Sequence, residues 1–172
     1  NTRVYEIRQI GRTPRESKVN KPKVLIGAHN AHRTEVEMII GLKNLGIDIH
    51  AALQSTSLFH QRLQEAGVPT RVMDLSGNID IRGILEIRRW IKKENFDIAH
   101  GLANRAVANF IWASYGQPNR VIAYRGAIGH VSRWDPSCYI KWLSPRIDKI
   151  ICVSDAVKRD LAKNGVSQNK LV

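Results

Sequence analysis

Apolar and polar positions change along this chain in blocks that predict strands and helices in turn. The first block, 23–28, is apolar without alternation, which is typical of a strand buried on both faces, as in a parallel sheet. A polar turn follows, and then a helix that we expect Thr34 to open, because Thr34 and Glu37 have the spacing of a capping box. Apolar residues recur at helical spacing until Gly46, which is expected to end this helix.

The same change of period continues to the end of the chain. Further strands are predicted over 47–53, 68–73, 97–101, 120–124 and 149–153. Helices are predicted over 57–66 and 80–94, in the small-residue segment that follows 101, and after Ser154, which can cap the last helix. Helix-length connections between strands favour right-handed parallel crossovers. We therefore predict an α/β fold, a Rossmann-like doubly wound and mostly parallel sheet of about six or seven strands, with helices on both faces.

Candidate binding residues follow from this fold. In doubly wound domains the first strand lies near the middle of the sheet, and ligands bind beyond the carboxyl ends of strands. The loop after the first strand contains His29, Asn30 and Arg33, which are candidates for substrate binding, although polar residues are also ordinary in solvated turns.

A second group of candidates lies at the end of the 97–101 strand. His100 ends this strand, where a substrate contact and a structural role in the core are equally good interpretations. Asn104 and Arg105 follow at the start of the next helix, and Asn104 can equally serve only as the helix cap.

The loop after the fifth strand is the strongest candidate. It contains Arg125, Gly126, His130 and Arg133 in a passage without any regular period. Arginine is suited to bidentate binding of phosphate or carboxylate, so we expect this loop to contact an anionic group of a substrate.

Charge adds a prediction about partners. The 172 residues carry a formal net charge of +12. Such an excess favours a partner of opposite sign, whether a phosphate, an anionic lipid or a nucleic acid, although a cationic surface kept for solubility is an alternative. Residues 1–21 form a basic leader or edge segment, and 80–94 carries Arg88, Arg89, Lys92 and Lys93.

Several classes of function lack their signatures. The two cysteines, Cys138 and Cys152, have neither the number for a disulfide framework nor the spacing of a metal site, and they are typical of reduced thiols in a cytosolic protein. The chain has no Gly-x-Gly-x-x-Gly motif after a strand and no P-loop, which argues against dinucleotide and nucleotide enzymes of those classes. No apolar run approaches the length of a membrane span, so we expect any membrane contact to be peripheral.

Two motifs resemble those of family 4 glycosyltransferases, which have the GT-B architecture. The run Asp97-Ile98-Ala99-His100 is similar to the one that closes their fourth major strand. The passage 148–154, followed by a helix and then by Lys170-Leu171-Val172, is similar to the one that leads out of their N-terminal domain. The similarity covers roughly residues 22–172. The chain differs from the family pattern after its fifth strand, where many members have a histidine and this chain has Arg125-Gly126.

The resemblance implies a function. It implies that 22–172 is the acceptor-side domain of a retaining glycosyltransferase, with the donor-binding domain absent from this chain. Such an enzyme moves a sugar from a nucleotide-sugar to a glycan or lipid-linked acceptor, as in lipopolysaccharide or polysaccharide synthesis. It needs no cofactor and no bound metal, and we expect it in the cytoplasm, peripheral on the inner face of the plasma membrane. The chain alone is expected to be inactive.

Two alternatives remain open at this point. One is half of a GT-B-like nucleotide-sugar 2-epimerase. The other is a non-catalytic basic α/β module that binds nucleic acid, against which stands the absence of a recognisable binding motif.

Overall fold

The computed structural model describes residues 21–28 and 31–172. Residues 1–20, which make up nearly all of the predicted basic leader, lie outside the described residues, and so do the candidates His29 and Asn30.

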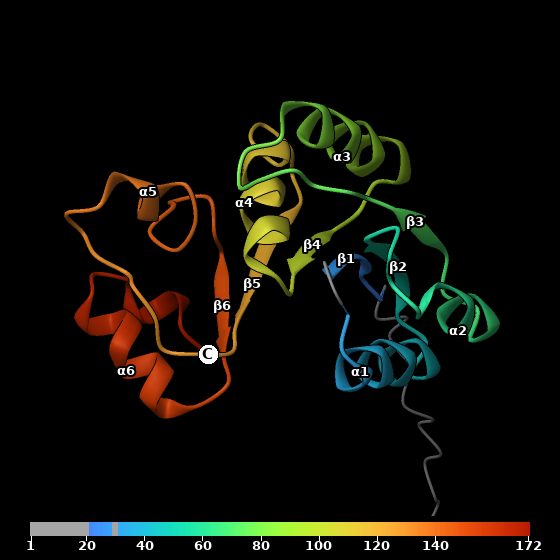
Figure 1. Ribbon diagram of the computed structural model, residues 1–172, viewed down its shortest axis with the longest axis horizontal. Coiled ribbons are helices and arrows are strands. Elements are labelled where there is room, and N and C mark those ends of the chain that lie inside the picture. The colour runs from blue at the N-terminus through green and yellow to red at the C-terminus, as the bar shows by residue number, and fades with distance from the viewer. Residues whose placement is uncertain (1–20, 29–30) are drawn as a thin grey trace, which may run out of the picture.

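A six-stranded sheet forms the centre of the described part of the chain (Figure 1). Its strands are β1 (Lys23–Ala28), β2 (Asp48–Leu53), β3 (Thr70–Val72), β4 (Ile98–Gly101), β5 (Arg120–Arg125) and β6 (Lys149–Cys152). They are ordered β3-β2-β1-β4-β5-β6, and every neighbouring pair is parallel. The predicted doubly wound fold is therefore confirmed, with β1 in the interior between β2 and β4.

Helices connect the strands. They are α1 (Arg33–Asn44), α2 (His60–Glu65), α3 (Ile81–Glu94), α4 (Asn104–Ala113), α5 (Pro136–Tyr139), α6 (Asp155–Lys163) and the short 3-10 helix η1 (Gln168–Lys170). The helices α1 and α2 pack on one face of the sheet, against Ile26, Ile49 and Leu53. On the other face α3 and α4 pack against Leu25 and Ala99. The helix α6 joins α4 over β5 and β6.

The ends of these helices test the sequence-based predictions. Thr34 does not open α1, so that prediction was wrong: the cap is His32, whose backbone N–H donates to the Glu35 carboxylate at 2.9 Å. The predicted partner Glu37 instead forms an ion pair with Arg62 of α2. The Ser154 cap is confirmed, since its hydroxyl accepts from the backbone N–H of Val157.

Two glycines let α4 lie directly on the sheet. A Cβ at Gly27 of β1 would meet the Phe110 ring at 2.7 Å, and a Cβ at Gly101 of β4 would meet backbone atoms of Val107 at 2.8 Å. Because no side chain separates them, the start of α4 is held against the carboxyl ends of β1 and β4. This contact fixes the position of the candidate site.

Candidate functional site

The strand order reverses between β1 and β4, and the chain leaves these two strands in opposite directions. Doubly wound folds bind ligands in the crevice that this divergence opens beyond the carboxyl ends of the strands. Here α1 and α4 begin on either side of it, with Arg33 as the first residue of α1 and Asn104 as the first residue of α4. Both side chains are exposed. The fold thus brings two separate sequence-predicted candidates to the same edge.

The described residues around the crevice enclose little space. A cavity of only about 10 Å³ lies next to it, lined by small and apolar residues of β1, β2, α4 and the segment after β3. Ala28, Ala52 and Ala106 are among these residues. Such a surface can form one wall of a binding site, and it does not enclose a ligand by itself.

His100 lies within the sheet beneath this edge. Its side chain is buried, and Nδ1 lies 3.2 Å from the carbonyl oxygen of Ile122 in β5. A carbonyl only accepts, so the ring donates from Nδ1. Burial lowers the pKa of His100, an effect that this hydrogen bond opposes. The hydrogen bond from His100 ties β4 to β5, and the contact of His100 with a substrate stays a prediction.

Arg105 and Asn109 attach the segment between β3 and α3 to α4. Arg105 donates to the carbonyl of Leu75 at 3.3 Å. Asn109 is fully buried; its Oδ1 accepts from the backbone N–H of Asp80, and its Nδ2 donates to the carbonyl of Gly77, both at 2.9 Å. The sequence analysis missed Asn109, although a polar residue among the apolar positions of a helix was the available signal. Its role is to position the loop beside the crevice.

Arg125 is the most unusual charged residue of the site. It ends β5, and its guanidinium lies 4.6 Å from the centre of the Trp142 ring, a cation–π contact. Its Nε is buried and has no hydrogen-bond partner among the described residues. Burial lowers the pKa of Arg125, while attraction to Asp160 opposes this effect. A partly desolvated guanidinium is suited to bind an anion through its terminal nitrogens, because electrostatic attraction strengthens as water is excluded.

The rest of the predicted loop surrounds Arg125. Gly126 follows it directly, and a Cβ on Gly129 would meet a terminal nitrogen of Arg125 at 2.6 Å, so a side chain at position 129 would displace the guanidinium. His130 is exposed, with Nε2 at 3.2 Å from the Asp135 carboxylate. Arg133 lies next to Gly165, at the end of α6. Of this loop, only Arg125 and Gly126 are fixed to the end of a strand.

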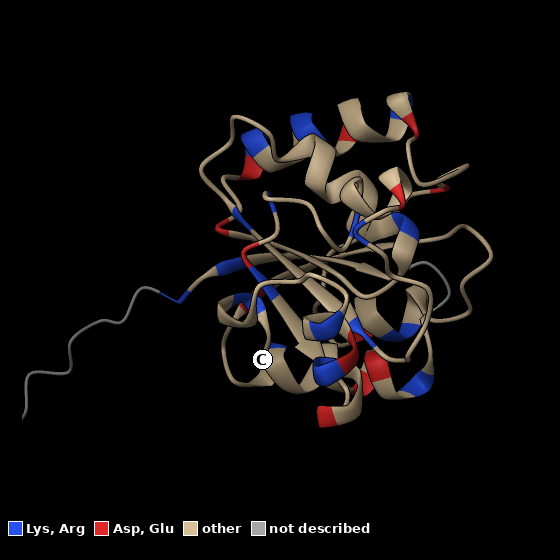
Figure 2. Ribbon diagram, turned by 90° about the vertical axis from the view of Figure 1, so that its left-hand side faces the viewer, with Lys and Arg blue, Asp and Glu red and all other residues tan. Residues whose placement is uncertain are grey.

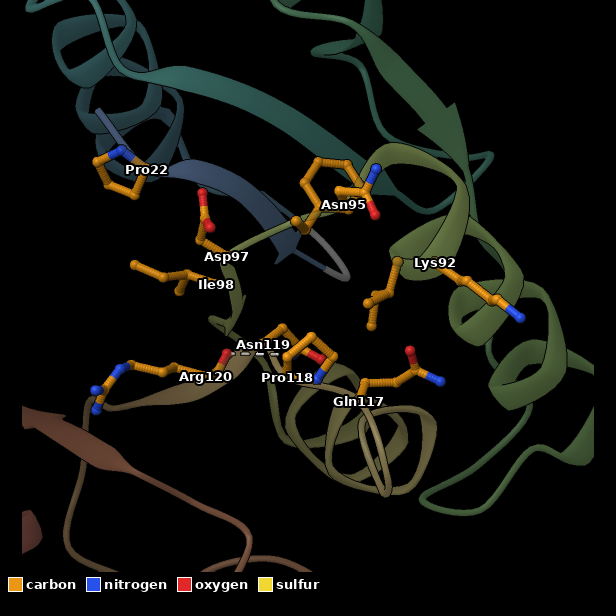
Figure 3. A pocket seen from close by; sticks show the side chains of 11 residues that line it. Pro22, Lys92, Asn95, Asp97, Ile98, Gln117, Pro118, Asn119 and Arg120 are labelled. Atoms are coloured by element: carbon orange, nitrogen blue, oxygen red, sulfur yellow. Dashed lines mark hydrogen bonds between the residues drawn. The ribbon is translucent and has the colours of Figure 1, made fainter. Parts of the chain in front are cut away.

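A larger cavity lies at the opposite edge of the sheet (Figure 3). It has a volume of about 540 Å³ and is lined by residues at the amino ends of β4 and β5 and at the end of α3. Figure 3 shows Asp97, Asn119 and Arg120 around it, with the Asn119 side chain donating to the carbonyl of Arg120. Because ligands of this fold bind at the carboxyl edge, we do not assign the larger cavity as the substrate site.

The positive charge is not gathered at the crevice. Figure 2 shows Lys and Arg on many elements, including α3 and α6. None of the helices in the described part of the chain has the length and apolar character needed to span a bilayer.

Comparison with known proteins gives a family and a fold. The family model described as Glycosyltransferase Family 4 matches residues 31–172. A comparison with curated proteins finds no match.

Solved structures share the fold. A glycosyltransferase from Rickettsia africae ESF-5 has a TM-score of 0.72 at 20% identity, over 89% of this chain and 42% of that one. The structure of Anabaena Alr3699/HepE in complex with UDP and glucose has a TM-score of 0.65 at 12% identity, over 88% of this chain and 43% of that one. The UDP-N-acetylglucosamine 2-epimerase from Rickettsia bellii has a TM-score of 0.59 at 9% identity, over 87% of this chain and 44% of that one. The chain thus spans less than half the length of each of these proteins.

Proposed function

This chain belongs to Glycosyltransferase Family 4, and from that premise we propose that it is the acceptor-side domain of a retaining glycosyltransferase. The enzyme would move a sugar from a nucleotide-sugar donor to a glycan or lipid-linked acceptor in cell-envelope or polysaccharide synthesis. The observation that carries the proposal is the shallow crevice between β1 and β4, flanked by the starts of α1 and α4 and by Arg125.

A shallow wall suits this role. The solved relatives are more than twice as long as the matched region, and one of them holds UDP and glucose. A second domain that closes over the crevice would complete the site and exclude water. The acceptor wall must then hold a hydroxyl oxygen near the anomeric carbon of the donor, and such positioning supplies a large part of a rate enhancement. The new bond forms between this oxygen and the anomeric carbon as the bond to the diphosphate breaks, and the hydroxyl proton passes to the departing diphosphate.

Arg125 has a defined part in this proposal. Its partly desolvated guanidinium at the end of β5 supports the binding of a phosphate, either on a lipid-linked acceptor or on the departing diphosphate. We expect Arg125→Lys in the full-length protein to lower kcat/KM at least about tenfold, because lysine cannot reproduce the planar fork of donors. Arg133→Lys is the matched control in the same loop, and its exposed side chain predicts a smaller effect.

The experiment is a transfer assay with the full-length protein, a panel of nucleotide-sugars and lipid-phosphate or glycan acceptors. Transfer that retains the anomeric configuration, read by NMR of the product, would support the proposal. Inversion would contradict the retaining mechanism, and equal effects of the two arginine variants would contradict the role of Arg125.

A nucleotide-sugar 2-epimerase is the second candidate, because the Rickettsia bellii epimerase has the same fold over 87% of this chain. An epimerase changes the nucleotide-sugar when no acceptor is present, whereas a transferase needs the acceptor. Incubating the full-length protein with UDP-N-acetylglucosamine alone, and following the sugar by NMR, separates the two candidates.

A membrane surface is the partner that a lipid-linked acceptor would require. The outward side of α3 supports it: Ile81 and Leu85 are exposed, and with Trp112 of α4 they line an apolar groove of about 240 Å³. Exposed Arg89, Lys92 and Lys93 continue the same helix. Arg88 is a weaker candidate than its neighbours, because it donates to the carbonyl oxygens of Ala113 and Tyr115. Apolar and basic side chains on one helix suit the surface of an anionic bilayer.

Vesicle co-sedimentation tests this partner. Binding to anionic vesicles should exceed binding to neutral ones and weaken as salt rises, since each basic residue gains on the order of 1 kcal/mol near an anionic leaflet. Replacing Arg89, Lys92 and Lys93 with glutamine should reduce binding, whereas Arg159→Gln with Lys163→Gln on α6 should not. Equal binding to both kinds of vesicle would reject the surface, and tighter binding to DNA at matched salt would favour the nucleic-acid module. Location at the inner face of the plasma membrane stays part of this proposal.

A further inference from the structure

Three side chains with different metal-binding atoms converge after β5. His130, Asp135 and Cys138 each place one ligand atom within 4.8 Å of the other two. His130 Nε2 lies 3.2 Å from Asp135 Oδ2, and Cys138 Sγ lies 3.7 Å from the same oxygen. The two cysteines alone gave no metal spacing in the sequence, because this group combines one cysteine with two other residue types.

These distances match those between the ligands of a tetrahedral zinc ion. Bond lengths of about 2.1 Å to nitrogen and oxygen and 2.3 Å to sulfur give ligand separations of about 3.4 Å for N···O and about 3.6 Å for O···S. The two separations in this structure, 3.2 Å and 3.7 Å, fall close to these values. The third pair, His130 Nε2 and Cys138 Sγ, lies within 4.8 Å, and a turn of the exposed His130 side chain would bring all three atoms to the separations of a tetrahedral ion.

Hydrogen bonds from the backbone hold two of the three side chains in the orientation that a bound ion needs. Asp135 Oδ1 accepts from the backbone N–H of Ser137 at 2.8 Å, which leaves Oδ2 to face the histidine and the cysteine. The backbone N–H of Ser132 donates to Cys138 Sγ at 3.4 Å, a contact that holds the sulfur in place. Partners of this kind orient the ligands of metal sites.

Burial and charge are also consistent with a bound ion. Cys138 is 3% exposed and the Asp135 side chain 32%, while that of His130 is 76% exposed, so the site opens to solvent on one side. A thiolate, a carboxylate and a neutral imidazole together balance the charge of a divalent cation. Thiolate and imidazole ligands favour Zn²⁺ over Mg²⁺ or Ca²⁺, which prefer oxygen.

We propose that His130, Asp135 and Cys138 bind a zinc ion that ties the loop after β5 to α5, with water at the fourth position. The ion has a structural role: it holds the loop that folds over Arg125. This inference rests on the ligand geometry alone, and it stands or falls independently of sugar transfer.

Cobalt provides the test, because Co²⁺ replaces Zn²⁺ and a sulfur ligand gives it a near-ultraviolet charge-transfer band. The untagged chain, titrated anaerobically with Co²⁺, should show this band, saturate at an equimolar amount and lose the band when Zn²⁺ is added. Cys138→Ser should abolish the band. Cys152→Ser, which removes the other cysteine, should keep it.

Two further variants keep the test decisive if Cys138→Ser fails to fold. His130→Ala changes an exposed side chain, and Asp135→Asn keeps a residue suited to the N-cap, so both variants should fold. Each should weaken Zn²⁺ binding more than about 100-fold, because losing a residue that only supports a metal ligand already costs about 10–100-fold. His32→Ala, at another exposed histidine, should leave the affinity unchanged. Absence of the band in the unmodified chain, its loss in Cys152→Ser, or unchanged affinity in His130→Ala would overturn the proposal.

Discussion

At the scale of single residues, small side chains decide how closely the elements of this domain approach. Gly27 and Gly101 lie where any Cβ would enter α4, and Gly129 lies where a Cβ would meet Arg125. The glycines therefore shape the candidate site, although they contribute no functional group to it.

Adding one methyl group at Gly101 should show this. Gly101→Ala is expected to lower the free energy of unfolding by about 1–3 kcal/mol, because the new Cβ would lie 2.8 Å from Val107 backbone atoms that cannot move freely. Gly41→Ala is the matched control on α1, where nothing lies within 4 Å, and it should stabilise by roughly 0.4–1 kcal/mol. Urea denaturation measures both. Equal effects at the two positions would show that close packing of α4 is not the cause.

Asn109 should be the most sensitive polar residue of α4. Asn109→Ala leaves the Asp80 N–H and the Gly77 carbonyl without their partner, which should cost about 1–3 kcal/mol. Asn104→Ala, on the exposed start of the same helix, should change stability by no more than about 0.5 kcal/mol. Limited proteolysis should detect faster cleavage between β3 and α3 in Asn109→Ala alone. Resistance equal to that of the unmodified chain would argue against anchoring by Asn109.

At the scale of elements, the segment between β3 and α3 shows how one cap organises a loop. Asp80 is the N-cap of α3: it accepts from the backbone N–H of Gly83, and its other oxygen accepts from the backbone N–H and the hydroxyl of Ser76. These hydrogen bonds, that from Gly83 first, lower the pKa of Asp80 from 3.8 to about 2. The cap thus fixes the start of the helix and the turn before it.

Acid should weaken this cap. Because the folded pKa of Asp80 lies below its unfolded value, its carboxylate adds stability that is complete above about pH 5 and is lost as the pH falls toward 2. Asp80→Asn keeps a good cap residue without the titration. The stability difference between the unmodified chain and Asp80→Asn should therefore shrink between pH 5 and pH 3, measured by urea midpoints. A difference independent of pH would contradict the assignment.

At the scale of the whole molecule, the reversal of strand order between β1 and β4 places the two flanking loops and Arg125 at one edge. Beside the crevice between β1 and β4, the described residues line a cavity of only about 10 Å³, while a cavity of about 540 Å³ lies at the opposite edge. We infer that the substrate site needs a second wall, consistent with relatives of more than twice the matched length.

The chain of 172 residues should accordingly fold but neither transfer sugar nor bind UDP-sugars tightly. Rate enhancement needs interactions with the donor in the transition state, and we propose that these come from the second wall. Isothermal titration with UDP-glucose and a transfer assay with the isolated chain measure both properties, with far-ultraviolet circular dichroism as the control for folding. Tight binding or turnover by the isolated chain would show that the site is complete in these residues.

The sequence by itself determined the order of elements and their parallel arrangement. The apolar run of β1 and the alternation of strands with helices suffice for this. A strand buried on both faces requires a continuous apolar run, and helix-length connections favour right-handed parallel crossovers, so both features can be recognised in short stretches of sequence. Local signals were also enough for Ser154 as a cap, but not for Thr34: hydrogen bonds around His32 and Glu35 set the start of α1. The family motifs predicted the glycosyltransferase relationship that the family model confirms.

Only the tertiary structure decided which candidates act on each other. Arg125 gains its importance from Trp142, seventeen positions later in the chain, and from a donor that burial leaves unpaired. Asn109 forms hydrogen bonds with the loop before α3 only because α4 lies on two glycines of the sheet. His130, Asp135 and Cys138 meet through the path of an irregular loop. Such contacts depend on distances between segments that share no periodic pattern. The sequence therefore indicates the candidate residues, and only the fold determines which residues they contact.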